Sequence, residues 1–183
     1  MKYRFKIGIS ACLLGNKVRY DGAHAYDRYL EETIGKFVEW VAVCPEVECG
    51  LQVPREPMRL EGNPASPRLL TKKTGIDHTN RINGWCKKRL IRLKKEDISG
   101  FIFKSRSPSC GLRSVKVYMM PSTNSIRTGR GIFAEAFIRR FPGIPVEDED
   151  RLIGNYRLDN FMERVFMPGR WKSPEDGSKT AWI

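Results

Sequence analysis

Three cysteines of this chain follow the ends of apolar segments that resemble β-strands. They are Cys12 after residues 7–10, Cys44 after residues 37–43 and Cys110 shortly after residues 101–104. Because the carboxyl ends of parallel strands line one crevice of an open α/β sheet, we expect the three thiols to meet in space. Three sulfur ligands make too few bonds to close a tetrahedral metal site. A coordination position would therefore stay open for another ligand, as catalytic metal sites require.

The chemistry of cysteine narrows the kind of site. Thiolates are soft ligands that suit iron–sulfur clusters and zinc, but the Cys-x-x-Cys pair typical of zinc sites does not occur in the sequence. His24 and His78 are isolated, which argues against a histidine-rich metal site and leaves a Cys–His catalytic dyad as a minor alternative. The residues alone therefore leave both an iron–sulfur cluster and a zinc site open.

The two remaining cysteines differ in what their positions predict. Cys86 shares one face of a predicted helix with Ile82, Leu90 and Leu93, so we expect it to be a core residue. Cys49 lies close to Cys44 in sequence and stays open as an alternative ligand.

Polar residues near the thiols are candidates for catalysis and substrate binding. Glu46 follows Cys44 by two residues, and a carboxylate beside a Lewis-acidic metal suits general acid/base work on water; the alternative is that it caps nearby backbone N–H groups. The segment 107–111 brings two hydroxyls next to Cys110, from Ser107 and Ser109. Two further candidates lie in loops: residues 19–22 contact substrate or form a plain turn, and the glycines of residues 129–131 offer an anion site at a helix start.

The elements that must position these residues alternate between strands and helices. We expect strands at 4–10, 38–43, 100–103, 115–118 and 144–146, and helices at 27–37, 77–95, 131–141 and 149–166. Residues 44–67 are rich in proline and glycine and are expected to form a long ordered loop. The alternation predicts a single α/β domain over residues 1–170, with a mainly parallel, Rossmann-like sheet flanked by helices. Residues 171–183 are expected to be a flexible polar tail.

Composition and charge restrict the possible partners. The 183 residues carry 33 Lys and Arg against 21 Asp and Glu, a net charge of +12 that favours a polyanion, nucleic acid before membrane. No apolar window reaches the roughly 20 residues of a membrane span. The apolar stretch before Cys12 is too short for a secretory signal, so we expect a cytoplasmic protein with reduced thiols.

Several motifs together resemble the thiouracil desulfidase family. They are Ser10–Gly15, Val18–Gly22, Cys44-Pro45-Glu46, Gly50–Leu51, Val53–Arg55 and Ser107–Gly111, within a match that extends over about residues 6–166. Longer segments resemble the branch that acts on 4-thiouridine in tRNA, although the C-terminal helical domain often fused to that branch is not in this sequence. These are Cys44–Gly50, Pro54–Leu60, Gly100–Pro108 and Asn160–Phe166.

The resemblance implies a [4Fe–4S] cluster held by Cys12, Cys44 and Cys110, with one iron left open for the thiocarbonyl sulfur of the substrate. Thiophilic iron would polarise the C=S bond, water would attack the ring carbon, and sulfur would leave as hydrosulfide without net electron transfer. The resemblance assigns proton transfer to Glu46 and orientation of substrate or water to Ser107, with Ser109 as a weaker candidate.

The charge distribution decides the expected substrate. The cations of residues 87–95, together with Lys104, Arg106 and Arg113 around the Cys110 segment, suit tRNA phosphates. We therefore expect 4-thiouridine in tRNA as substrate, bound by Arg19, Tyr20, Asp21, Ser109 and Lys104. The alternative is a desulfidase of small free thiobases or nucleosides such as 2-thiouracil. A further alternative is a non-enzymatic, metal-stabilised RNA-binding module.

Overall fold

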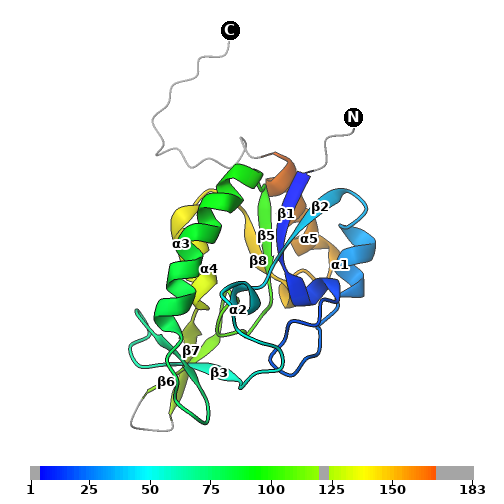
Figure 1. Cartoon of the computed structure of the whole chain (residues 1–183). Helices are drawn as coiled ribbons and strands as arrows, with labels where there is room; N and C mark the ends of the chain where they lie inside the picture. The colour runs from blue at the N-terminus through cyan, green and yellow to red at the C-terminus, as the bar shows by residue number, and fades with distance from the viewer. Residues whose placement is uncertain (1–4, 120–123, 168–183) are drawn as a thin grey trace, which may run out of the picture.

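A parallel sheet of four strands forms the centre of the computed structural model, which describes residues 5–119 and 124–167. Its strands are β1 (Phe5–Ser10), β2 (Val38–Val43), β5 (Gly100–Phe103) and β8 (Val146–Asp148). They lie in the order β2-β1-β5-β8, and every pairing is parallel (Figure 1). The expected α/β fold with a parallel sheet flanked by helices is confirmed.

Helices cover both faces of this sheet. On one face lie α3 (Thr79–Glu96) and α4 (Ile132–Arg140), and on the other α1 (Arg28–Thr33) and α5 (Asn155–Phe166) (Figure 1). Side chains alternate along β5, so Phe101 and Phe103 pack against α3 and α4 while Ile102 packs on the opposite face.

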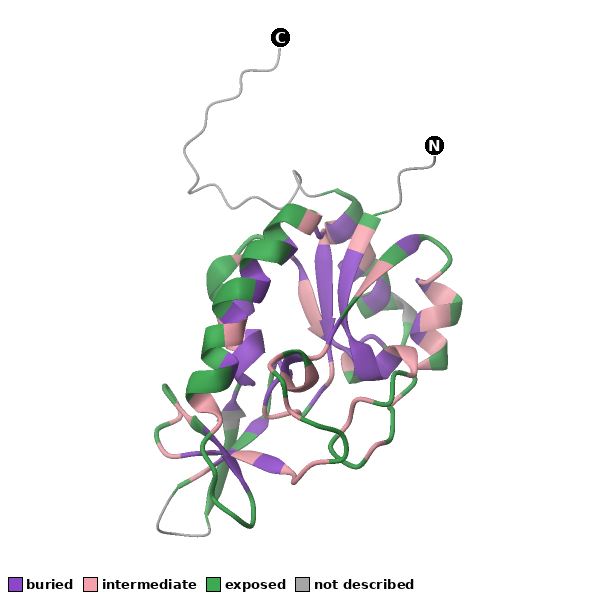
Figure 2. Cartoon of the chain, in the orientation of Figure 1, coloured by how far each residue is buried: buried purple, intermediate pink, exposed green. Residues whose placement is uncertain are grey.

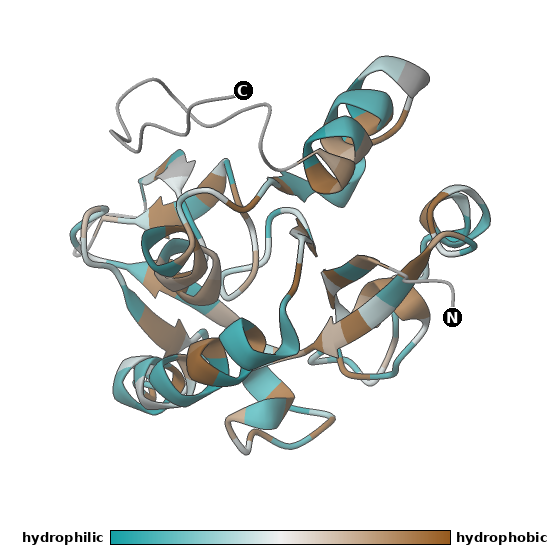
Figure 3. Ribbon diagram, turned by 90° about the horizontal axis from the view of Figure 1, so that it is seen from above, coloured by the Kyte–Doolittle hydropathy of each residue, from teal (hydrophilic) through white to brown (hydrophobic). Residues whose placement is uncertain are grey.

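The central strands are buried on both faces and the outer face of α3 is exposed (Figure 2). Figure 3, in which the helices are seen nearly end-on, shows the hydrophilic and hydrophobic sectors around them.

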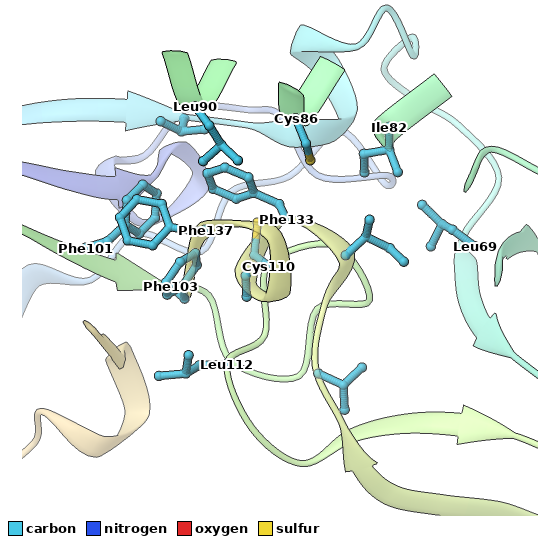
Figure 4. Close-up of a cluster of buried hydrophobic side chains, with 14 of the residues drawn as sticks. Leu69, Ile82, Cys86, Leu90, Phe101, Phe103, Cys110, Leu112, Phe133 and Phe137 are labelled. Carbon is cyan, nitrogen blue, oxygen red and sulfur yellow. The ribbon is translucent and has the colours of Figure 1, made fainter. Parts of the chain in front are cut away.

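Aromatic rings and one cysteine fill the core beneath α3. Phe101, Phe103, Phe133 and Phe137 are fully buried, and their ring centroids lie 4.3–6.0 Å apart in stacked, tilted and edge-to-face contacts. Cys86 points from α3 into this cluster beside Leu90 and Ile82 (Figure 4). The prediction that Cys86 is a core residue is confirmed.

A second sheet lies beyond the carboxyl ends of the first (Figure 1). It contains β3 (Met58–Glu61), β4 (Arg68–Thr71), β6 (Val115–Tyr118) and β7 (Ser125–Gly129) in the order β4-β3-β6-β7. β3 pairs antiparallel with β4 and parallel with β6, and β6 pairs antiparallel with β7. Of these strands only 115–118 was expected. The interpretation of 44–67 as loop throughout was wrong, because it holds β3 and the one-turn helix α2 (Pro45–Glu48).

Other boundaries shift for local reasons. α1 ends at Thr33 before Gly35, so Phe37 is 63% exposed and does not continue the buried stripe of Leu30 and Ile34. The strand expected at 144–146 lies two residues later, at β8. The helix expected at 149–166 is split into a 3₁₀ turn (Glu149–Arg151) and α5, since Gly154 has a positive φ of 101°. The expected tail at 171–183 lies outside the described residues.

The order of the strands creates a crevice beside β1. The chain leaves β1 through the 3₁₀ turn η1 (Ala11–Leu14) and α1 to reach β2, and it later enters β5 on the other side of β1 before continuing to β8. Neighbouring strands β1 and β5 thus send their connections in opposite directions, which is where ligands bind in open α/β sheets. Within the described ranges, the structure contains no helix long and apolar enough to cross a membrane.

Candidate active site

A cavity of about 420 Å³ opens at this crevice, between the ends of β1, β2 and β5. Eight of the ten site residues that the sequence predicted line it: Cys12, Arg19, Tyr20, Cys44, Glu46, Lys104, Ser107 and Cys110. Its volume lies in the lower part of the range for small-molecule sites, about 300–1,000 Å³. Parallel strands therefore bring together side chains that are far apart in sequence.

The three thiols each belong to a different strand end. Cys12 lies in η1 directly after β1, Cys44 is the N-cap of α2 directly after β2, and Cys110 follows β5 by seven residues in a loop. Cys12 and Cys110 are buried, and Cys44 is half-buried with its Sγ 4.0 Å from the Val18 carbonyl oxygen. All five cysteines of the chain are free thiols.

Burial favours the neutral form of each of these thiols. It raises the pKa of Cys12 to about 11, with the neighbouring Cys44 adding to the effect and Lys104 opposing it. Burial likewise raises the pKa of Cys44 and raises the pKa of Cys110 further, where Cys44 and Cys12 also contribute. Cys44 thus contributes to the raised pKa of both Cys12 and Cys110. Because metals bind thiolates, binding here would release protons and would be the event that ionises the thiols.

The donor set at the cavity consists of three thiols, which are soft ligands of the kind that iron–sulfur clusters use. In the ranges that the structure describes, no three His, Cys, Asp or Glu side chains are grouped closely enough to hold one metal ion. Three thiols around the wall of one cavity are a different arrangement, since each ligand of an iron–sulfur cluster binds its own iron. The residues present are therefore compatible with the cluster that the sequence predicted.

Cys49 takes no part in the cavity. Its Sγ donates to the Glu46 carbonyl oxygen at 3.2 Å, and it lines a separate hollow against α3 with Arg81 and Arg92. Burial raises the pKa of the Cys49 thiol and of the Cys86 thiol, the latter to about 12. The described arrangement gives neither residue a place among the thiols of the cavity.

Glu46 is the carboxylate among the described residues that line the cavity. It lies in the first turn of α2, where Pro45 suits the first helical position because it has no N–H to satisfy. Glu46 Oε2 accepts from Arg55 Nε at 2.8 Å, and Glu46 Oε1 accepts from Ser109 Oγ at 2.8 Å. Arg55 also donates to the Val18 carbonyl oxygen at 2.9 Å. Arg55 belongs to the motif Val53–Arg55 of the sequence analysis, which did not predict its contact with Glu46.

The two serines of the Cys110 loop have different positions. Ser107 lines the cavity, and its Oγ accepts from the N–H groups of Ser109 at 3.2 Å and Cys110 at 3.1 Å. Ser109 is 1% exposed and does not line the cavity, so its contact with the site is the hydrogen bond to Glu46. Ser109 therefore reaches the site through Glu46 in this structure, and its expected contact with substrate stays a prediction.

The N-terminus of α4 supports this loop and is not open to an anion. The N–H groups of Gly131, Ile132 and Phe133 donate to the carbonyl oxygens of Gly111, Pro108 and Ser109, at 2.8, 3.2 and 2.9 Å. A Cβ on Gly131 would lie 2.5 Å from the backbone of Ser109, so glycine permits this close approach. The anion site expected at residues 129–131 was wrong, because the loop carbonyls already accept these donors.

In the segment Arg19–Asp21, two residues line the cavity and one does not. Arg19 and Tyr20 line the cavity, whereas Asp21 accepts from the N–H of Ala23 at 3.1 Å and from Arg19 at 3.4 Å. The hydrogen bond from Ala23 and the Arg19 guanidinium lower the pKa of Asp21. Asp21 therefore forms the turn that was its alternative interpretation, and Arg19 and Tyr20 remain candidates for substrate contact.

Lys104 forms an ion pair with Glu149, which the sequence analysis did not name as a candidate site residue. Its ammonium pairs with Glu149, which is 7% exposed and also accepts from the Ser105 N–H at 2.5 Å. The basic helix α3, by contrast, contributes no residue to the described lining of the cavity. Its Arg89 is buried and pairs with Glu48 and Glu96.

Comparison with known proteins identifies the family of this chain. A solved structure described as the [4Fe-4S]-dependent thiouracil desulfidase TudS superposes with a TM-score of 0.63 and 34% identity, covering 81% of this chain and 93% of that one. The uncharacterized protein YbbK of Bacillus subtilis (strain 168) is 30% identical over 131 residues, which are 69% of this chain and 85% of YbbK. The sequence profile of 2-thiouracil desulfurase matches residues 7–149, from β1 to the end of the parallel sheet. The chain therefore belongs to the 2-thiouracil desulfurase family.

Proposed function

We propose that this chain is a desulfidase that converts the C=S group of a free thiolated pyrimidine base, such as 2-thiouracil, to C=O. The observation that carries the proposal is the convergence of Cys12, Cys44 and Cys110 with Glu46 on one cavity of about 420 Å³. The family and the structural likeness to a thiouracil desulfidase support the same substrate class. The reaction balances as C=S plus H₂O giving C=O plus H₂S, so no electron donor is needed.

The three thiols would hold a [4Fe–4S] cluster, with one iron left without a cysteine. When bound, the cluster supplies a thiophilic metal that draws electron density away from the C=S bond. The reducing cytoplasm is the compartment that suits such a cluster and five free thiols.

Glu46 would take the proton from the attacking water. Arg55 and Ser109 hold both oxygens of its carboxylate, which fixes the direction in which the free lone pairs face the cavity. Ser107, which also lines the cavity, would orient the substrate or the water, and Lys104 would bind the polar edge of the base. Arg19 and Tyr20, from the loop after β1, would contact the base near the mouth.

Anaerobic reconstitution with iron and sulfide tests this function. We expect about four irons per chain with acid-labile sulfide, and loss of the ultraviolet absorption of 2-thiouracil in step with release of sulfide. One zinc without labile sulfide, and no turnover of thiobases, would instead favour the metal-stabilised RNA-binding module.

A second candidate substrate is 4-thiouridine in tRNA, favoured by a basic groove next to the cavity. The groove has a volume of about 310 Å³ and shares Met58, Lys72, Arg106 and Pro108 with the cavity. Its other cations are Arg59, Lys116 and Arg127, and no carboxylate is among its described lining residues. Phosphates of an RNA backbone would suit such a groove.

Charge reversal separates the two substrates. If tRNA is the substrate, Lys116→Glu with Arg127→Glu should raise the KM for tRNA at least tenfold and leave the KM for 2-thiouracil unchanged, with binding that weakens steeply as salt rises. The matched control is Arg28→Glu with Lys36→Glu, two exposed cations outside the groove, the cavity and the basic helix α3. Turnover of 2-thiouracil without turnover of tRNA would leave the free base as the substrate.

A further inference from the structure

Four consecutive carboxylates at the end of β8 face the loop that carries Cys110. Glu147 pairs with Arg113, Asp148 accepts from the Leu112 N–H at 2.9 Å, and Asp150 lies 3.5 Å from Arg106. Glu149 accepts from the Ser105 N–H at 2.5 Å and from Ser105 Oγ at 2.9 Å. The loop between Lys104 and Arg113 is therefore attached to one short segment at both of its ends.

Glu149 combines two features that its neighbours have separately. It is buried, as Asp148 is, and its partner lines the cavity, as Arg106, the partner of Asp150, also does. Glu147 and Asp150 pair with arginines whose side chains are 44% and 75% exposed, whereas the Lys104 side chain, at the cavity, is only 23% exposed. A buried carboxylate is costly unless it is paired and hydrogen-bonded. The contacts from Lys104 and Ser105 supply that compensation, so the charge of Glu149 and the placement of Lys104 depend on each other.

We propose that Glu149 is a positioning residue, which holds the Lys104 ammonium at the cavity wall and fixes the first turn of the loop that carries Ser107 and Cys110. The inference rests on the proposed function. When water attacks the base, negative charge develops on its heteroatoms, and a preorganised ammonium stabilises that charge better than one that must reorient. Glu149 acts through Lys104 and does not touch the substrate.

A double-mutant cycle tests this dependence. Glu149→Gln keeps the size of the side chain and removes its charge, and we expect it to lower kcat for 2-thiouracil about tenfold. In the Lys104→Met background the same change should lower kcat less than about twofold, because the partner is already absent. Equal factors in both backgrounds would overturn the proposal. The matched control is Glu147→Gln, two residues earlier in β8, which should leave kcat within about twofold of the wild type.

A second pair of variants, at Lys104, tests the ion pair if Glu149→Gln does not fold. Lys104→Met leaves the buried Glu149 without its cation, so the free energy of unfolding of each variant is measured beside kcat. Lys104→Arg can still pair with Glu149 and should retain most of the activity that Lys104→Met loses. Equal loss in both would contradict a role for the ion pair.

Hydrogen exchange of the iron-free chain gives a readout that does not depend on activity. Glu149→Gln should speed the exchange of the amides of residues 105–112 relative to the wild type and to Glu147→Gln. Unchanged exchange would overturn the positioning role even in an active enzyme. If wild-type protein has no thiobase turnover but the loop loosens in Glu149→Gln, the proposed function fails while the attachment of the loop stands.

Discussion

Helix α3 and the loop from Lys104 to Leu112 contain similar chemical groups but serve different purposes. Each carries a buried cysteine, and each carries cations that the sequence alone assigns equally to a functional surface. Cys86 and Cys110 even belong to the same hydrophobic cluster, and burial raises the pKa of both thiols (Figure 4). Only the loop lies at the crevice beside β1 and β5 and lines the cavity. The position of a residue in the fold thus says more about its function than its chemical type does.

The first prediction tests whether Cys110 and Cys86 differ as ligands of a cluster. Cys110→Ser should abolish the visible absorption of a reconstituted cluster and reduce activity below detection, because a thiolate ligand is lost. Cys86→Ser should retain the absorption, although it is destabilised by a hydroxyl in an apolar site. Visible absorption and iron content after anaerobic reconstitution measure both. A full cluster in Cys110→Ser would refute the ligand assignment.

The second prediction concerns the carboxylate that the loop holds through Ser109. Glu46→Ala should keep the cluster and lower kcat by about 10²–10⁴, the usual contribution of a general acid or base. The control is Glu32→Gln, which changes an exposed i,i+4 pair on α1 and should leave kcat unaltered. Loss of iron in Glu46→Ala would mean that Glu46 is a ligand or a structural support, and that another group moves the proton.

The third prediction concerns the far end of the loop, at Asp148. Asp148→Ala leaves the buried Leu112 N–H without its acceptor and should lower the free energy of unfolding by about 1–3 kcal/mol, measured by urea denaturation. Asp148→Asn keeps an oxygen acceptor and should cost less at pH 7.5. A loss in Asp148→Asn as large as that in Asp148→Ala would contradict the role of the oxygen acceptor.

The same residue predicts a pH dependence. Burial raises the pKa of Asp148 to about 6 from an ordinary value of 3.8. The folded state therefore binds the proton more tightly, and the contribution of this group to stability is complete below about pH 4 and lost as the pH rises to 6. The difference in free energy of unfolding between wild type and Asp148→Asn should change across this window and stay constant above pH 7. A constant difference throughout would contradict the raised pKa.

Much of the fold and most of the site followed from the sequence. Apolar runs mark β1, β2 and β5, and because parallel strands end at one edge, the positions of Cys12, Cys44 and Cys110 were enough to predict a shared cavity. Helical spacing with Ile82 and Leu90 was enough to place Cys86 in the core. These features are local, or depend on one general rule of sheet geometry, so they are encoded in residue type and spacing.

The tertiary structure decided what depends on pairing between distant segments. The second sheet joins β3 to β6 across more than fifty residues, and β3 lies in a segment whose prolines and glycines favour a loop until that distant pairing forms. The contacts of Glu46 with Arg55 and Ser109, of Glu149 with Lys104, and of the α4 N–H groups with the Cys110 loop exist because of strand order and register. A sequence specifies that a carboxylate or an N–H needs a partner, but only the folded chain selects which one, since many donors and acceptors are chemically equivalent until distance separates them.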